Sequence, residues 1–468
     1  MSQNASFKSS LSLLDATMIV AGSMIGSGIF LVSAEIARSV GSAGWFTVMW
    51  VLAGIVTMIA AVSYGELSGM FPRAGGQYVY LREAYNPFVA FLFGWTQFSV
   101  IQTGTIAAVA VAFAKFTAYL IPAFSEQHIL FDAGFVKVSA AQIVAIISIV
   151  LLTYINTRGI RNGKIIQTVF TLAKLLSLFG LIIFGFLIGA KHEVWSANWQ
   201  NAWTAQSLQQ VNGQTVTTLL TGVAFLGAVA VSMKGSLFSS DAWNNVTFIA
   251  AEIKNPQKNI GRSLFLGTLI VTIIYVSANI MYLAVLPMNE IAFAANDRVG
   301  VAAAEHIFGN SGSLIIAVMI MISTFGCNNG LTLAGARIYY TMAQDGLFFK
   351  QAAELNRFSV PAKGLWIQCI WASLLCLSGR YGDLLALVIF GVLIFYVLTI
   401  LGIFILRKKQ PDAPRPYKAF GYPVLPMLYI VVAVFLALLL LVFEANYTLP
   451  GLGIILLGIP LYYIGRRK

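Results

Sequence analysis

The chain has 468 residues, of which 59% are hydrophobic and only 10% are charged. Soluble domains carry roughly 25% charged residues, so this composition cannot cover the surface of a soluble protein. The net charge of +12 would suit a nucleic-acid-binding protein, yet the Lys and Arg residues fall mostly in short segments between apolar runs. Many of these runs are about 20 residues long, the length that crosses a bilayer as a helix. The sequence therefore predicts a polytopic helical membrane protein that binds no nucleic acid.

Polar segments, prolines and glycines divide the chain into twelve predicted spans. An even number of spans places both termini on the same side of the membrane. The predicted spans, in chain order, are Leu13–Arg38, Ala43–Gly69, Pro87–Leu120, Val138–Asn156, Lys164–Ala190, Thr217–Ala251, Gly261–Pro287, Ser311–Thr341, Gly364–Gly379, Asp383–Leu406, Pro423–Glu444 and Leu449–Tyr463.

The Lys and Arg residues are unequally divided between the two sides of this arrangement. With a cytoplasmic N-terminus, 21 of the 29 lie in cytoplasmic loops or tails. Cytoplasmic loops of membrane proteins carry such an excess. The sequence therefore predicts a multi-pass protein of the cytoplasmic (inner or plasma) membrane, with both termini in the cytoplasm. The chain start lacks a signal-peptide cleavage pattern, so we expect the first apolar run to be retained as a span.

Two loop segments suggest structural roles. The longest predicted external stretch, residues 191–214, contains Trp195, Trp199 and Trp203, and tryptophan is favoured at the membrane interface. We expect this stretch to form an interfacial cap. The string Tyr64–Leu67, followed by Pro72–Tyr78, predicts a tight cytoplasmic loop between two helices.

Small residues interrupt the first span at its centre, where Gly22, Gly26 and Gly28 occur together with Ser23 and Ser27. Glycine weakens a helix, and backbone groups freed inside a membrane need partners. One interpretation is a small-residue packing face made by Gly22 and Gly26. The other is a broken helix, whose free amides around Ser27 and Gly28 bind an anion at the start of the second half-helix.

The sixth span has a comparable interruption from Gly235 to Asn245, with Asp241 among serines. A carboxylate at this depth is costly unless it faces a cavity or a partner. Interruptions in spans one and six, five spans apart, are expected for an inverted repeat of two five-helix units. Transporters of this kind bind their substrate between the broken helices.

Two lysines lie within predicted spans. Lys174 is ten residues beyond Lys164, about 15 Å along a helix from the cytoplasmic edge. At that depth we expect it to face the protein interior and contact backbone carbonyls or an acid, in the place of a bound cation. A position lining a water-filled vestibule is the alternative. Lys234, nearer the external side, is expected to be an ordinary vestibule residue.

The residues needed for a metal site or an enzyme are scattered. His128, His192 and His306 fall in separate predicted external loops, and the three cysteines lie in apolar segments. We therefore expect no metal, no cofactor and no disulfide framework. An intramembrane enzyme would need a nucleophile and a base that converge at depth, and the spacing of the acids Asp241 and Glu252 indicates no such pair. The sequence predicts no enzyme and no catalytic residues.

Four motifs, in the right order, resemble those of the amino acid-polyamine-organocation superfamily. The chain is most similar to its L-type amino acid transporter branch, in particular to bacterial members, and the likeness covers nearly the whole chain. The motifs are Gly26-Ser27-Gly28-Ile29-Phe30, the string from Tyr64 to Tyr78, Phe170-Thr171-x-Ala173-Lys174, and the string from Trp243 to Pro256.

This resemblance implies an all-α integral membrane protein with a leucine-transporter-type fold of twelve transmembrane helices. Ten core helices would form a 5+5 inverted repeat with broken helices 1 and 6, followed by two accessory helices. The first repeat would cover residues 1–190, the second residues 191–410, and the accessory helices 11 and 12 residues 411–468. Transport would proceed by alternating access around helices 1 and 6.

The resemblance also implies a binding site for an α-amino acid. Its carboxylate would lie on the amides around Ser27, and its ammonium on carbonyls of both breaks. Phe238 matches the family's aromatic gate. Lys174 matches the helix-five lysine that, in sodium-independent relatives, stands where sodium-coupled relatives hold an ion. The implied substrate-binding residues are Met24, Ile25, Gly26, Ser27, Gly28, Phe238, Ser239 and Asp241.

Some positions depart from the family pattern. Animal relatives pair with a glycoprotein through a cysteine after helix 3, and residues 122–137 contain none, so no disulfide-linked heavy subunit is expected. Ser240 stands where several relatives carry an aromatic residue, which leaves a modest, partly polar pocket. Asp241 recurs in members that accept cationic amino acids and in members that do not.

These features predict a sodium-independent exchanger of small neutral amino acids. Its partners would be the amino acid substrate and the lipid bilayer. Two alternatives stay open. One is a proton-coupled amino acid symporter, in which Lys174 changes protonation during the cycle. The other is a nontransporting amino acid sensor that shares the fold and the site.

Overall fold

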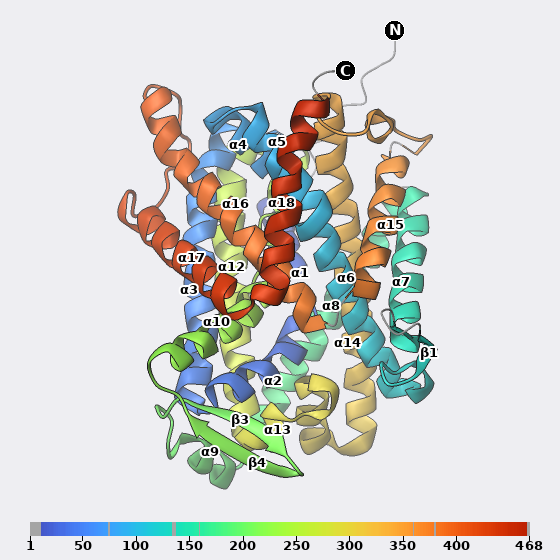
Figure 1. Cartoon of the computed structure of the whole chain (residues 1–468), viewed down its shortest axis with the longest axis vertical. Coiled ribbons are helices and arrows are strands. Elements are labelled where there is room, and N and C mark those ends of the chain that lie inside the picture. Colours follow the sequence, from blue (N-terminus) through green and yellow to red (C-terminus); the bar gives the residue numbers. More distant parts are fainter. Residues whose placement is uncertain are drawn as a thin grey trace.

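The computed structural model describes residues 11–73, 75–132, 137–158, 160–358, 360–378 and 381–465. Its helices run mostly along the long axis of a bundle (Figure 1). The first half contains α1 (Leu13–Met24), α2 (Gly28–Val40), α3 (Ala43–Met70), α4 (Gln77–Ala84), α5 (Pro87–Thr96), α6 (Gln102–Leu120), α7 (Ala140–Thr157), α8 (Ile160–Phe184) and α9 (His192–Trp199). The second half contains α10 (Gly222–Ser239), α11 (Asn245–Phe248), α12 (Pro256–Val285), α13 (Met288–Ala292), α14 (Val299–Gln344), α15 (Ala362–Ser378), α16 (Tyr381–Lys409), α17 (Val424–Phe443) and α18 (Ala445–Gly465).

Two short hairpins lie at one end of this bundle (Figure 1). Strands β1 (Ile129–Asp132) and β2 (Lys137–Ser139) pair antiparallel, as do β3 (Gln206–Val211) and β4 (Gln214–Leu219). Both belong to segments that the charge distribution predicts to be external. Helix α18 ends at the opposite end of the bundle.

Many of the helices are long and apolar enough to cross a membrane. By length and composition, nine helices of the described residues qualify, or eleven if each of two bent helix pairs counts as one span. The bent pairs are α1 with α2, at 45°, and Lys174–Gly189 with α9, at 102°. A shorter apolar helix runs over Ala362–Leu377. Each of the twelve predicted spans overlaps a helix, so the all-α membrane class is confirmed, while the count of twelve crossings stays a prediction.

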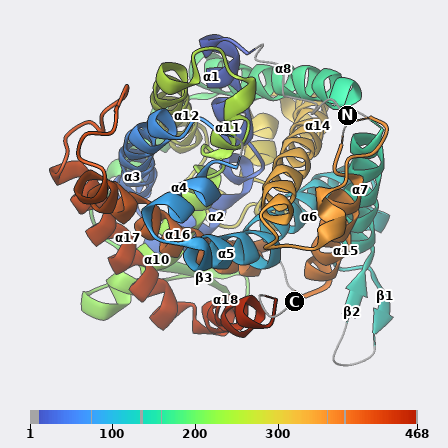
Figure 2. The ribbon, with the colours of Figure 1, turned by 90° about the horizontal axis from the view of Figure 1, so that it is seen from above.

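The helices that carry the two interrupted spans pack together inside the bundle. Helix α2 lies against α10, α1 against α12, and α12 along α3, while α14 packs on α6 and α8. Seen from above, α1, α11 and α12 lie beside one another, with α14 across the interior from α3 (Figure 2). The apolar side chains of these helices form one continuous buried cluster. Spans one and six are therefore held side by side in the interior.

The structure corrects several predicted boundaries. Thr217, the predicted start of the sixth span, lies in strand β4, and the helix begins at Gly222. Alternating small polar residues favour the hairpin over a helix there. Helix α14 begins at Val299, twelve residues before the predicted span, and breaks at Gly309, whose φ of 72° suits glycine. The predicted interfacial cap at residues 191–214 consists of α9, a turn and most of the β3–β4 hairpin.

The prediction that Tyr64–Leu67 belongs to a loop is wrong, because these residues form the last turns of α3. Glu66 is 1% exposed, and its carboxylate accepts two hydrogen bonds from Arg407, at 2.7 and 2.9 Å. Arg415 Nε lies 3.3 Å from Glu66 Oε1, and the Ala419 amide donates to Oε2 at 2.8 Å. The buried carboxylate of Glu66 thus joins the end of α3 to α16 and to the segment that follows α16.

We predict that Glu66→Gln destabilises the fold, because two guanidinium groups then lose their carboxylate. Removing one partner of a buried ion pair costs about 3 to 5 kcal/mol. The apparent midpoint of heat unfolding of the purified protein in detergent should fall clearly. Glu193→Gln, at an exposed acid of α9, is the control and should leave it unchanged. Equal midpoints for the two variants would contradict a stabilising role of Glu66.

Candidate functional site

The first break separates α1 from α2. Helix α1 ends at Met24, Ile25 adopts an extended ψ of 95°, and Ser27 caps the start of α2. The amides of Ser27, Gly28 and Ile29 donate no hydrogen bond to another part of the described chain. These free amides at the start of a helix are suited to bind an anion such as a carboxylate. The break predicted in the first span is therefore confirmed, while anion binding by its amides stays a prediction.

The second break follows α10. Helix α10 ends at Ser239, Asp241 and Ala242 lie in the break, with Ala242 at a φ of 65°, and α11 starts at Asn245. The two breaks approach each other closely at Gly28, where an added Cβ would lie 2.1 Å from Ser239 Oγ. A glycine at position 28 allows this approach. Residues 211 positions apart in the sequence, Gly28 and Ser239, thus come together at one point.

A tyrosine of α12 joins the two breaks from the side. The Tyr275 hydroxyl donates to the Met24 carbonyl at 2.9 Å and lies 3.1 Å from the Ser239 carbonyl. Backbone carbonyls released from a helix inside a membrane need such donors. Two carbonyls of the predicted ammonium site are therefore already hydrogen-bonded to Tyr275.

Lys174 of α8 lies behind the first break and is completely buried. Its ammonium donates hydrogen bonds to the Gly22 carbonyl and, at 3.0 Å, to the Ile25 carbonyl. It makes no ion pair within the described residues. The expected contact with backbone carbonyls is confirmed, and it places the Lys174 side-chain nitrogen at the C-terminal, negative end of the α1 dipole.

Aromatic residues cover one side of the site. Phe238 packs edge-to-face on Tyr381 of α16, with ring centres 6.1 Å apart, and the Tyr381 and Ser27 hydroxyls are 3.2 Å apart. Lys115 Nζ lies 5.9 Å from the Tyr381 ring centre and 3.6 Å from Asp297. Asp297 also binds Arg38 at 2.8 Å. The site is thus closed on this side by the ring pair of Phe238 and Tyr381 and, beyond it, by the ion pairs of Asp297.

A cavity lies between the two breaks and encloses about 330 Å³ of atom-free space, which includes open solvent. It brings together seven of the eight predicted substrate-binding residues: Met24, Gly26, Ser27, Gly28, Phe238, Ser239 and Asp241. Ile25 is outside this lining, because its carbonyl accepts the hydrogen bond from Lys174. We call this cavity, with its lining, the cradle.

Lys234 differs from its predicted surroundings, and Glu252 has a partner in α14. Lys234 is buried rather than in a vestibule, and its ammonium binds Glu35 at 2.9 Å and Glu444 at 3.0 Å. Glu444 lies between α17 and α18, so this lysine joins α10 to α2 and to the last two helices. Glu252 pairs with Arg337 of α14 at 3.1 Å. The prediction for Lys234 was wrong because both of its partners are far away in the sequence.

Comparison with known proteins assigns the chain to a family. A family model described as amino acid permease matches residues 11–458. The chain belongs to the amino acid permease family. The family and its relatives named below are described as transporters, so the coarse prediction of a membrane transporter is confirmed.

Three relatives show which known transporters the chain is similar to. It is 30% identical to the serine/threonine exchanger SteT of Bacillus subtilis (strain 168), over 98% of this chain and 97% of the relative. It is 29% identical to the mouse large neutral amino acids transporter small subunit 2, over 98% and 81% of the two chains. It is 27% identical to the mouse b(0,+)-type amino acid transporter 1, over 99% and 89%. The predicted likeness to the L-type branch and to a bacterial member is confirmed.

Sequence reasoning missed several residues of this permease site, among them Tyr275, Tyr381, Thr105 and Cys327. Cys327 of α14 lines the cradle, with its thiol 3.7 Å from the Ser23 carbonyl. A tyrosine within an apolar span was a usable signal, because its hydroxyl needs a partner inside the membrane. Among the described residues, no group of three or more His, Cys, Asp or Glu side chains could hold a metal ion.

We predict that Lys174→Met impairs transport more than folding. The variant removes two charge-assisted hydrogen bonds to the first break, each worth about 1.5 to 3 kcal/mol, so exchange should fall at least about tenfold. Uptake into proteoliposomes and the gel-filtration profile measure the two effects. Lys191→Met, at an exposed lysine, is the control. Wild-type uptake by the Lys174 variant would remove this lysine from the mechanism.

We also predict that Gly28→Ala disables the site, because its Cβ collides with Ser239. Overpacking of this kind costs about 1 to 3 kcal/mol and forces the two breaks apart. Substrate binding, measured by scintillation proximity on purified protein, should be strongly weakened. Gly180→Ala is the matched control, since an added Cβ at Gly180 meets no atom within 4 Å. Similar binding by both variants would speak against the close approach at Gly28.

Proposed function

We propose that this chain is a sodium-independent exchanger of small neutral amino acids that works by alternating access. The observation that carries the proposal is the buried ammonium of Lys174 on the carbonyls of Gly22 and Ile25. A fixed cation at the broken helix occupies backbone carbonyls that could otherwise coordinate a metal cation. The name of the relative from Bacillus subtilis, a serine/threonine exchanger, supports exchange and small substrates.

The substrate would lie in the cradle with its carboxylate on the free amides of Ser27 and Gly28. Its ammonium would face carbonyls of the two breaks, and Phe238 would cover it from outside. Because the Met24 and Ser239 carbonyls already accept hydrogen bonds from Tyr275, each would use its second lone pair for the ammonium. Ile25 would contribute indirectly, through Lys174.

Alternating access would proceed between two inverted repeats. Residues 1–190 would form the first repeat, residues 191–410 the second, and residues 411–468 the accessory helices. Both repeats contain one broken span, and the two breaks meet in the cradle. Opening toward the outside would require Phe238 to leave Tyr381 and Asp297 to leave Lys115.

We further propose that the protein resides in the cytoplasmic membrane, with both termini in the cytoplasm, and functions without a disulfide-linked heavy subunit. The distribution of Lys and Arg supports this orientation. Cys327, Cys369 and Cys376 are all buried in helices, where they are unsuited to an intermolecular disulfide.

The exchange proposal predicts that internal substrate stimulates uptake. Labelled alanine, serine and threonine should enter sodium-free proteoliposomes several times faster when the lumen is preloaded with the same unlabelled amino acids. Addition of sodium should not change this rate. Equal uptake into empty and preloaded vesicles would overturn exchange, and acceleration by an imposed pH gradient would then identify proton symport. Substrate binding without any uptake would identify a sensor.

A further inference from the structure

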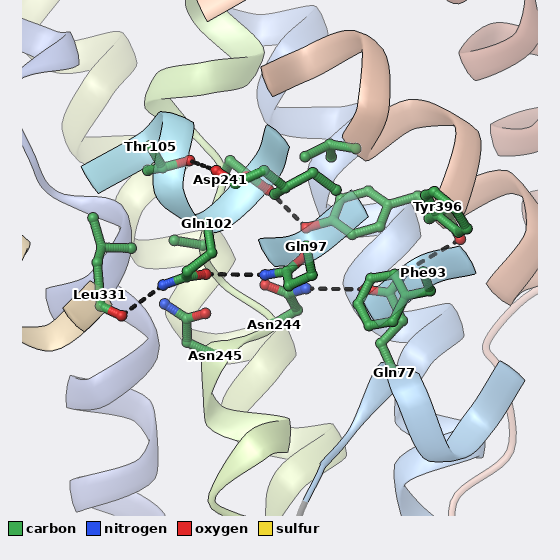
Figure 3. A pocket seen from close by; sticks show the side chains of 14 residues that line it. Gln77, Phe93, Gln97, Gln102, Thr105, Asp241, Asn244, Asn245, Leu331 and Tyr396 are labelled. Carbon is green, nitrogen blue, oxygen red and sulfur yellow. Dashed lines mark hydrogen bonds between the residues drawn. The ribbon is translucent and has the colours of Figure 1, made fainter. Parts of the chain in front are cut away.

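A second cavity adjoins the cradle on the side away from Phe238 and encloses about 340 Å³ of atom-free space, which includes open solvent. Asp241 and Ala242 line both cavities, together with Thr105 and Leu331. We call the second cavity the amide chamber, because five carboxamide side chains line it (Figure 3). They are Gln77, Gln97, Gln102, Asn244 and Asn245.

Four of these five amides are fixed by hydrogen bonds. Gln97 donates to Gln102 at 2.9 Å, and Gln102 donates to the Leu331 carbonyl at 2.6 Å. Asn244 donates to Gln77 at 3.3 Å. All five amides are buried. Polar side chains in the interior of a membrane protein are costly and mark substrate pathways more often than packing, so this concentration of amides calls for a ligand.

The backbone beside the chamber is also irregular. Residues Gln97–Ile101 form a π-helical turn between α5 and α6, and both end residues of this turn line the chamber. Single π-helical turns inside helices occur frequently at functional sites, because the extra residue re-aims side chains. Here the turn places Gln97 and Gln102, five positions apart, in direct hydrogen-bonding contact.

Asn245 differs from the other amides of the chamber. Its side chain makes no hydrogen bond within the described residues, although the residue is only 6% exposed. It lies in the chamber beside Gln102 (Figure 3). A buried carboxamide without a partner has a donor and an acceptor to offer to a ligand.

The charge of the chamber has one sign. Asp241 is the only ionisable carboxylate or cation among its fourteen lining residues, and it accepts a hydrogen bond from the Tyr396 hydroxyl at 2.7 Å. The lining therefore offers hydrogen bonds to an uncharged group and repels a second carboxylate. An apolar group placed there would leave the buried amide of Asn245 without a partner.

We propose that the amide chamber is the subsite for the substrate side chain and selects side chains that donate hydrogen bonds and carry no negative charge, hydroxyls and carboxamides being the small ones. This inference rests on the proposed amino acid transport through the cradle. It adds a rule for selectivity: polarity decides between substrates of equal size. Threonine is then preferred over valine, and asparagine over both leucine and aspartate.

Isosteric pairs test this selectivity in the full-length protein. Uptake of labelled serine into preloaded proteoliposomes is inhibited with threonine or valine, and with asparagine, leucine or aspartate. Threonine and asparagine should inhibit at concentrations at least about tenfold lower than their counterparts, since a site built to hydrogen-bond a side chain rejects analogues that lack the group. Equal inhibition by threonine and valine would overturn the subsite. Uptake of no amino acid at all would instead overturn the proposed transport function.

A variant then ties the selectivity to the chamber. Asn245→Leu keeps the volume and removes the amide that has no partner, so the ratio of threonine to valine inhibition should fall toward one. Asn289→Leu, at an exposed asparagine after α12, should keep the wild-type ratio. An unchanged ratio in the Asn245 variant would place the selectivity elsewhere. If that variant does not fold, the wild-type isosteric pairs still decide.

Discussion

The site depends on how the backbone groups released at the first break are satisfied inside the bundle. Lys174 and Tyr275 supply donors to the carbonyls at the end of α1, whereas the amides at the start of α2 receive no acceptor from the described chain. The two sides of the break therefore differ, because its carbonyls already accept hydrogen bonds and its amides have no acceptor within the described chain. A carboxylate is a small anion that can accept hydrogen bonds from these free amides. The positive charge of Lys174 behind the break adds to this preference for an anion.

The surroundings of the site follow the same division of polar and charged groups. Charged pairs lie toward the two ends of the bundle, with Asp297 and Lys115 at one end and Glu66 and Arg407 at the other. Neutral amides line the chamber between them. The pair of Asp297, which is partly exposed, is less expensive to separate and reform than the buried pair of Glu66. The end of the bundle at Asp297 is therefore held together less firmly than the end at Glu66.

The sequence allowed the interruptions to be located, because glycine and serine in the middle of an apolar run have a direct backbone consequence. It also allowed the contacts of Lys174 to be anticipated, because depth along a helix leaves a charged group few options. The roles of Tyr275 and Tyr381 could not be predicted, because an apolar span has no polar face to show which side points inward. The partners of Lys234 could not be predicted for a different reason. They lie 199 and 210 residues away, and only the packing of whole helices brings them together. The amides of the chamber come from both halves of the chain and give no local pattern.

The position of Glu444 has a consequence for the order in which the chain is built. Helix α10 is synthesised long before Glu444, so of the two carboxylates that bind Lys234 only Glu35 is present when α10 is made. The second carboxylate arrives when nearly the entire chain is complete, at the junction of α17 and α18. A chain that stops before this junction would carry a buried lysine with one of its two carboxylate partners.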